Sequence, residues 1–283
     1  MAVSARDMPL IGSHDYGITL PLAPGEVVLT FDDGPRPPYT NHVLKALADE
    51  CLQAVFFMVG RQAIAHPQMV WQIRAAGHTV GTHTQNHPLH RMSPEHAERE
   101  IDAGIVSVGA ALGSPRALAP FFRFPGLFRS VEAERHLQAR GLMSWSVDVD
   151  SYDWKPIGPT QMLAHTLARL EARRGGILLM HDVQPKTALM LPTLLAELKS
   201  RGYRIVHVVP ASQDRVPLPD MVASTISQRR PPPPLATLSE PRRREITGSV
   251  GHAPYPAEIK RPEPGSGGLF EAIYTFSPHR WGR

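Results

Sequence analysis

The sequence VVLTFDDGP at residues 27–35 decides how the rest of the chain is interpreted. Its first five residues are apolar or β-branched, which predicts a buried β-strand. Gly34 and Pro35 end that strand, so Asp32 and Asp33 stand side by side at its carboxyl end. A metal ion that binds one carboxylate would remove their repulsion and leave the other free to act as a base. The alternative is a pair of solvated turn residues, since Asp-Gly and Gly-Pro are ordinary turn signals.

The composition is that of a globular protein with a nearly neutral body. The chain has 283 residues, of which 42% are hydrophobic, enough to bury a large core. Its net charge is +4, but ten basic against seven acidic residues lie from Gln213 onward, so the part before it is almost neutral. This balance gives no reason to expect nucleic-acid binding. The single cysteine, Cys51, excludes an intramolecular disulfide.

The sequence contains no segment typical of membrane insertion or export. It has no run of eighteen apolar residues, so no membrane span is expected. Residues 1–15 lack the continuous apolar stretch of a signal peptide, which predicts a cytoplasmic protein as the sequence stands. A truncated N-terminus would leave a periplasmic or extracellular location open.

Apolar runs of strand length alternate with segments of helical periodicity between residues 27 and 208. We expect seven strands, at residues 27–31, 54–60, 78–83, 120–123, 142–147, 177–180 and 203–208. We expect six helices, at residues 39–50, 67–76, 94–112, 130–140, 159–173 and 187–201. Such alternation predicts an α/β fold with a parallel sheet. The sheet either closes into a seven-stranded (β/α) barrel or stays open and doubly wound.

Composition divides the chain into three parts. Residues 1–24 are a lead-in that ends in Pro-Leu-Ala-Pro, and the alternating pattern follows to about residue 212. Residues 213–283 contain twelve of the 29 prolines and few large apolar side chains. Such a segment cannot bury enough apolar surface to offset the entropy of ordering it. We therefore predict a disordered Pro/Arg-rich tail.

Polar residues gather where the expected strands end. They are Asp32 and Asp33, His83 and His87, Arg123, Asp150 to Trp154, and His181 with Asp182. Because the carboxyl ends of parallel strands form one face, and active sites lie on that face, we expect these residues to meet.

His83 and His87 are candidate metal ligands. On one turn of helix, residues four apart project from the same side, which suits two ligands of a single ion. Two imidazoles and a carboxylate are ligands that zinc accepts, at roughly 2.0–2.2 Å, with a position left for water. Next to the Asp32-Asp33 pair, this spacing predicts a metal site.

Four further residues have both a structural and a catalytic interpretation. His181 is either a core histidine satisfied by a carboxylate or an acid that protonates a leaving amine. Arg123 is either a surface charge or a buried guanidinium that keeps Asp32 ionised and oriented. Asp150 and Asp153 either cap a helix, or one of them positions His181.

Taken together, these motifs resemble those of the polysaccharide deacetylases with the NodB homology domain, carbohydrate esterase family 4. The five matching motifs occur in the family's order over about residues 25–212, and a single one would be weak evidence. They are TFDDGP at 30–35, HTQNH at 83–87, RFPG at 123–126, DSYDW at 150–154 and LMHD at 179–182. The resemblance implies a distorted (β/α) barrel that removes N-acetyl groups from N-acetylglucosamine units with the help of a metal ion.

The resemblance also implies a role for each matching residue. Asp33, His83 and His87 would bind the metal, most commonly zinc. Asp32 would be the general base and His181 the general acid. Arg123 would steady Asp32, and Asp150 would tune His181. Leu179 and Trp154 would enclose the acetyl methyl group.

One motif departs from the usual form of the family. A further residue, frequently tyrosine, more often stands between the proline and the glycine, and its backbone N–H helps to hold the oxyanion. Here Gly126 follows Pro125 directly. We expect the Gly126 N–H to take that role.

The expected substrate is an acetylated glycan, such as a chito-oligosaccharide or a peptidoglycan-like chain. One alternative keeps the fold and the metal but hydrolyses a cyclic amide or ureide, as in allantoinase-like relatives. The other is a glycan-binding protein without catalysis. The presence of both Asp32 and His181 argues against it, because binding alone needs neither.

Overall fold

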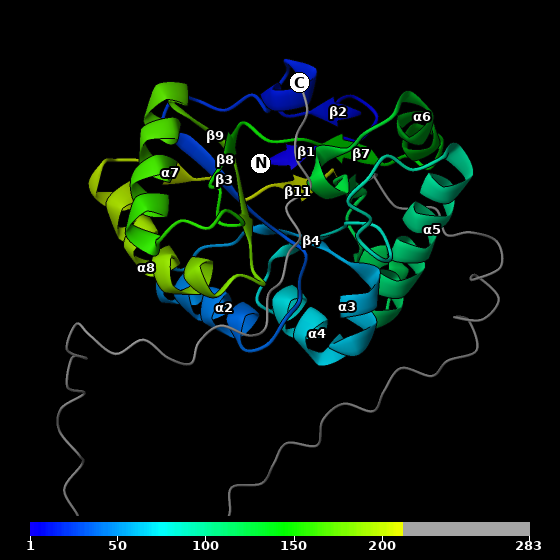
Figure 1. The fold of residues 1–283 in the computed structure, drawn as a ribbon, viewed down its shortest axis with the longest axis horizontal. Helices are drawn as coiled ribbons and strands as arrows, with labels where there is room; N and C mark the ends of the chain where they lie inside the picture. Colours follow the sequence, from blue (N-terminus) through cyan, green and yellow to red (C-terminus); the bar gives the residue numbers. More distant parts are fainter. Residues whose placement is uncertain (212–283) are drawn as a thin grey trace, which may run out of the picture. The chain divides into compact units, whose positions relative to one another are not determined.

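The central strand of the fold is β3, Glu26–Asp32, which is buried from Val27 to its end. The computed structural model describes residues 1–211 (Figure 1), so the tail predicted at 213–283 lies outside the described residues. Strand β3 pairs along its whole length with β9, Gly175–His181, and its last residues pair with β4, Val55–Met58. Both pairings are parallel, which confirms the sheet type expected from the sequence.

The sheet joins nine strands in the order β2-β7-β6-β5-β4-β3-β9-β8, with β10 paired to the start of β3. The other strands are β2 (Leu10–Ile11), β5 (Thr79–Thr82), β6 (Phe121–Phe122), β7 (Met143–Trp145), β8 (Val149–Asp150) and β10 (Arg204–Ile205). All seven expected strands are present, and the α/β fold is confirmed. Strands β2 and β8 are additional, and at two residues each they are too short to show a periodicity.

The end strands β2 and β8 do not pair with each other, so the curled sheet is a half-barrel. The lead-in contributes β2 and the short helix α1, Ser13–Tyr16. A separate ribbon joins β1, Ala2–Val3, to β11, Val209–Pro210. The lead-in therefore pairs with strands of the main fold. The domain boundary at residue 24 stays a prediction.

Helices follow the strands and surround the sheet from α7 and α8 through α2, α4 and α3 to α5 and α6 (Figure 1). Ser93 and Ser130 cap α5 and α6 by accepting hydrogen bonds from backbone N–H groups three residues on. The six expected helices are α2 (Tyr39–Asp49), α4 (Pro67–Ala75), α5 (Pro94–Ala111), α6 (Val131–Ala139), α7 (Pro159–Arg173) and α8 (Pro185–Ser200). Helix α3, Gly60–Ala65, was not expected, because it starts almost directly after β4.

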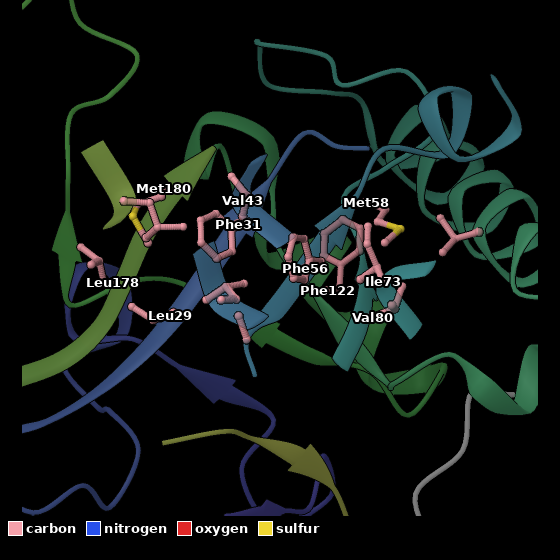
Figure 2. Close-up of a cluster of buried hydrophobic side chains, with 14 of the residues drawn as sticks. Leu29, Phe31, Val43, Phe56, Met58, Ile73, Val80, Phe122, Leu178 and Met180 are labelled. Atoms are coloured by element: carbon pink, nitrogen blue, oxygen red, sulfur yellow. The ribbon is translucent and has the colours of Figure 1, made fainter. Parts of the chain in front are cut away.

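Alternation along the strands divides the core into two layers. Leu29 and Phe31 of β3 belong to the outer layer, between the sheet and the helices, where Figure 2 shows them with Phe56 of β4. Val28 of β3 belongs to the inner layer, inside the curl of the sheet, together with Trp145 of β7. Each such large side chain contributes roughly 1.5–3 kcal/mol when fully buried.

The same alternation positions the site. Because side chains two residues apart share a face, Thr30 and Asp32 follow Val28 toward the inner side of the half-barrel. Lead-in residues Val3, Ile11 and Leu20 pack in the same inner layer as Val28. In the described part of the chain, no helix is long and apolar enough to span a bilayer.

Candidate active site

Neighbouring strand ends carry the predicted site residues. The sheet order places β8, β9, β3, β4, β5 and β6 next to one another. Along this edge lie Trp154 after β8, His181 at the end of β9, Asp32 at the end of β3, His83 after β5, and Arg123 after β6. The structure thus brings residues from distant parts of the chain to one face, as expected for a parallel sheet.

Asp32 is held by a buried ion pair. Its side chain is almost fully buried, and Arg123 Nη1 donates to Asp32 Oδ1 at 2.7 Å. The same guanidinium donates to Thr30 Oγ1 at 2.8 Å and to the Ser146 carbonyl at 3.2 Å, and it stacks on the Phe57 ring. Burial lowers the pKa of Arg123, and the charge of Asp32 opposes that shift. This fixed guanidinium orients Asp32 Oδ1 and leaves Oδ2 available.

Asp33 turns away from the strand and meets two imidazoles. Its φ of 76° lies in the left-handed region, so the chain turns between the two carboxylates. Asp33 Oδ1 lies 2.9 Å from His87 Nε2 and 3.4 Å from His83 Nε2. One ligand atom from each of the three residues lies within 4.8 Å of the others, which is close enough to share an ion.

The two histidines do not lie on a helix, so the expected helical turn at His83–His87 is wrong. Thr84 and His87 have φ values of 64° and 58°, and Thr84 Oγ1 accepts a hydrogen bond from the His87 N–H. Residues with a left-handed backbone conformation cannot form a right-handed helical turn, so residues 83–87 are a loop. The loop nevertheless brings the ring centroids of His83 and His87 to 5.0 Å from each other.

Hydrogen bonding decides which nitrogen of His83 faces the other ligands. His83 Nδ1 lies 2.7 Å from the Arg123 carbonyl oxygen, which can only accept, so Nδ1 carries the proton. The lone pair on Nε2 then faces Asp33 Oδ1, and Asp32 Oδ2 lies 3.7 Å away. Among the described residues, Asp33 Oδ1 is buried without a hydrogen-bond donor. The lone pair of His83 Nε2 and the carboxylate oxygens repel one another unless a cation lies between them. This arrangement therefore fits a divalent cation.

The charge of Asp33 is retained despite its surroundings. Burial alone would raise the pKa of Asp33, but the positive charge of His181 holds that pKa well below its usual value. Asp33 therefore stays ionised, as a metal ligand must be.

His181 is paired with Asp153. Its Nδ1 donates to Asp153 Oδ1 at 2.6 Å, while its backbone N–H and Thr187 Oγ1 both donate to Asp153 Oδ2. Burial alone would lower the pKa of the His181 imidazole, but the charge of Asp153, followed by that of Asp33, raises it well above the ordinary 6.5. The pairing with Asp153 therefore favours the charged imidazole and leaves Nε2 as the nitrogen that is not bonded to Asp153.

The prediction that Asp150 tunes His181 is wrong, because Asp150 has other partners. Its Oδ1 accepts from the Tyr152 N–H at 2.8 Å, and its Oδ2 accepts from Trp154 Nε1 at 3.1 Å. The left-handed Tyr152, with φ 58°, turns the chain so that Asp153 faces His181. Asp150 instead holds Trp154 in place, with 54% of that side chain exposed.

The remaining predicted residues lie on the two sides of this cluster. Leu179 of β9 is buried and pairs in register with Asp150 of β8. Gly126 lies in a short turn, Pro125–Leu127, three residues after Arg123, with a φ of 57°. Both are at the same strand edge as the histidines.

Glu100 of α5 supports the site and was missed from the sequence. Its Oε2 accepts from the backbone N–H groups of Gln85 and Asn86, and its Oε1 accepts from the Asn86 amide. Glu100 thereby anchors the loop between the two histidines. The sequence does contain an indication of this role, because Glu100 is an acidic residue next to Ile101, which lies on the apolar stripe of the helix.

Asp182 is a second buried acid beside the site. Thr40 Oγ1 donates to its Oδ2 at 2.6 Å, and Oδ1 has no partner among the described residues. Burial raises the pKa of Asp182 to about 7, and the charge of Asp33 adds to the shift. A Cβ on Gly34 would collide with this carboxyl group, so only glycine fits there.

We expect Asp182→Asn to reduce the pH dependence of stability. A carboxyl whose pKa is about 7 when folded and 3.8 otherwise stabilises the fold fully below pH 4 and loses that contribution as the pH rises through 7. Between pH 5 and pH 7 the wild type should lose about 2 kcal/mol more unfolding free energy than the variant. Urea unfolding at both pH values, with a chelator present, measures this. Equal pH slopes would contradict it.

Comparisons with known proteins identify the family, and the family model covers the first three of the five motifs. Residues 20–145 match the family model described as polysaccharide deacetylase. A peptidoglycan-N-acetylglucosamine deacetylase of Bacillus cereus is 33% identical over 188 residues, which are 64% of this chain and 85% of that protein. A chitooligosaccharide deacetylase of Rhizobium leguminosarum bv. trifolii is 32% identical, over 67% of this chain and 86% of that protein.

A solved structure shares the fold. The peptidoglycan deacetylase of Bdellovibrio bacteriovorus superimposes with a TM-score of 0.67 at 30% identity over 75% of this chain, which spans 59% of that protein. The match to the Bacillus cereus protein covers most of that relative at more than 30% identity. The chain therefore belongs to the polysaccharide deacetylase family, the carbohydrate esterases of family 4 that contain the NodB homology domain.

Proposed function

We propose that the chain is a metal-dependent deacetylase that hydrolyses N-acetyl groups of N-acetylglucosamine-containing glycans and releases acetate. The observation that carries this proposal is the arrangement around β3. Asp32 is fixed by Arg123, while its neighbour Asp33 faces His83 and His87. The family relatives, named as peptidoglycan and chitooligosaccharide deacetylases, support the substrate class.

Asp33, His83 and His87 are the proposed metal ligands, and zinc suits their two nitrogens and one oxygen. When bound, the ion would act as a Lewis acid on the acetyl carbonyl and make water at the site more acidic. The Arg123 carbonyl fixes the His83 tautomer, so the chain presents a ready lone pair.

Asp32 is the proposed general base. Its Oδ1 is held by Arg123, so Oδ2 takes the proton from the water that attacks the acetamide carbonyl carbon. Attack gives a tetrahedral oxyanion, toward which we propose that the Gly126 N–H donates a hydrogen bond.

His181 is the proposed general acid. The carboxylate of Asp153 keeps its imidazole protonated at neutral pH, and Nε2 delivers the proton to the nitrogen of the substrate. The carbon–nitrogen bond then breaks, which yields acetate and a free amine. Leu179 and Trp154 are proposed to enclose the acetyl methyl group, with Trp154 held by Asp150.

A screen for acetate release tests the function. The substrates should be chitin oligomers, peptidoglycan fragments and O-acetyl xylan, with allantoin as a cyclic ureide. We expect acetate from at least one N-acetylated glycan. Hydrolysis of allantoin alone would favour the ureide alternative, and binding of glycans without any hydrolysis would favour a non-catalytic protein.

Metal removal should abolish activity and be reversible. We expect a chelator to stop acetate release and one equivalent of zinc to restore it. The reason is that the ligand atoms of Asp33, His83 and His87 lie close enough together to share one ion. His87→Ala should weaken zinc binding at least about 10-fold. Mutation of a residue that only hydrogen-bonds to a metal ligand already lowers metal affinity by about this factor. Calorimetric zinc titration measures the affinity.

The matched control is His165→Ala, which removes an exposed imidazole of α7 outside the ligand triad. This variant should bind zinc like the wild type. Unchanged zinc affinity in His87→Ala would overturn the ligand assignment.

A further inference from the structure

Residues 146–148 connect two strands that lie near opposite ends of the sheet. They follow β7, which pairs with the end strand β2, and they lead into β8, the other end strand. Because the sheet is curled, this short connection crosses the open side of the half-barrel. We call residues 146–148 the crossing segment. All three of its residues are buried, so what holds them also fixes the inner side of the half-barrel.

The crossing segment contacts the proposed base through Arg123. The Ser146 carbonyl accepts from Arg123 Nη2 at 3.2 Å, and Nη1 of the same guanidinium donates to Asp32 Oδ1 at 2.7 Å. Asp148 bonds to β9, since its N–H donates to the Ile177 carbonyl and its Oδ2 accepts from the Ile177 N–H. A displaced crossing segment would therefore displace a hydrogen-bond partner of Arg123.

The lead-in provides hydrogen-bond partners for the whole crossing segment. The Ser146 N–H donates to the Ile11 carbonyl at 2.7 Å, and the Val147 carbonyl accepts from the His14 N–H at 2.9 Å. Asp148 Oδ1 accepts from a further backbone N–H of the lead-in at 2.8 Å. The crossing segment is thus bonded to the lead-in as well as to Arg123 and β9.

Two lead-in residues fit closely against Ser146. Gly12 has a φ of 106°, and a Cβ at Gly12 would lie 2.4 Å from the Ser146 carbonyl carbon, so only glycine fits there. Asp15 Oδ2 accepts from Ser146 Oγ at 2.5 Å, and the Asp15 side chain is only 18% exposed. Both residues precede residue 20, where the match to the family model begins.

We propose that Asp15 is a positioning residue for the reaction: through Ser146 it fixes Arg123, and thereby the orientation of Asp32. Hydrogen bonds to a carboxylate are about twice as strong as neutral ones, so the bond from Ser146 Oγ is a firm one. Together with the bond from the Ser146 N–H, it holds the Ser146 carbonyl toward Arg123. This inference rests on the proposed deacetylase function and assigns a part in it to the lead-in.

Steady-state kinetics test the positioning role. In Asp15→Ala we expect kcat for acetate release from a chitin tetramer to fall about 10-fold, because a small misplacement of a reacting group slows the reaction strongly. KM should change less than about 3-fold, since Asp15 touches no substrate. Ser146→Ala should lose about as much, and the double variant no more than either, because all three lack the same hydrogen bond. Asp15→Asn retains an acceptor oxygen and should recover most of the loss.

The matched control is Asp7→Ala, which removes an exposed carboxylate of the same lead-in. It should change neither kcat nor KM. Unchanged kcat in both Asp15→Ala and Ser146→Ala would overturn the proposal. A loss of about 100-fold in the double variant would also overturn it, because the two effects would then be independent. Zinc binding weakened as much as kcat in Asp15→Ala would show that the lead-in only supports the fold, which contradicts the positioning role.

Proton exchange at Arg123 separates this inference from the proposed function. In the full-length wild type the guanidinium is fully buried and both Nη atoms are hydrogen-bonded. By NMR, we expect its Nη protons to exchange about 10-fold faster in Asp15→Ala, while the backbone amides of β3 exchange as in the wild type. If the wild type releases no acetate but shows this difference, the deacetylase proposal fails and the positioning of Arg123 stands. Equal exchange in both proteins would overturn the positioning role whatever the activity.

Discussion

Asp32→Asn is expected to lower kcat for acetate release by about 10³-fold or more while one metal ion per chain stays bound. Asparagine keeps the hydrogen bond that Arg123 donates, but it cannot take up the proton of the attacking water. The proposed ligand Asp33 is unchanged, so metal affinity should stay close to that of the wild type. Acetate detection and metal analysis on the same preparation measure both quantities.

The control for this variant is Asp49→Asn, which neutralises an exposed carboxylate at the end of α2. Because Asp32→Asn leaves the buried guanidinium of Arg123 without a counter-charge, thermal unfolding must show that the variant is folded at the assay temperature. Full activity in a folded, metal-loaded Asp32→Asn would refute the base assignment. Loss of the metal would instead place Asp32 among the ligands.

Asp153→Asn should shift the basic limb of the pH–rate profile to lower pH. The carboxylate of Asp153 raises the pKa of His181, so its removal lowers that pKa and leaves less protonated imidazole at pH 8. We expect kcat at pH 8 to fall about 10²-fold, within the usual range for general acid catalysis. At a pH well below 7 the deficit should shrink, because His181 is protonated again.

Asp150→Asn is the matched comparison for this profile. It removes a carboxylate four positions from Trp154 but none from the hydrogen bonds of His181. Its profile should keep the wild-type position of the basic limb, with any change confined to KM. If Asp150→Asn shifts the limb and Asp153→Asn does not, the pairing observed here does not operate in the enzyme.

The sequence allowed the layout of the site to be predicted, because a few local rules place it. Alternation in β3 buries Val28 and Thr30 on the inner face, so Asp32 had to follow them. Parallel strands then collect their polar ends at one edge. The half-barrel was harder to foresee, since β2 and β8 contribute two residues each and sheet closure depends on contacts distant in sequence.

Local loop conformation was the part that spacing could not supply. His83 and His87 are four residues apart but meet through left-handed residues, which no helical rule describes. Asp150 and Asp153 were equally good candidates until the turn at Tyr152 selected one. Glu100 anchors the histidine loop from a helix, and only the fold brings the two together.

The proposed function depends on one claim: Asp33, His83 and His87 coordinate one cation while Asp32 remains outside its coordination sphere. A crystal grown with zinc and measured at the zinc absorption edge tests this claim directly. We expect one anomalous peak at roughly 2.0–2.2 Å from the Asp33 oxygen and from both Nε2 atoms, with Asp32 still bound to Arg123. A peak that includes Asp32 as a ligand, or no peak between these three side chains, would contradict it.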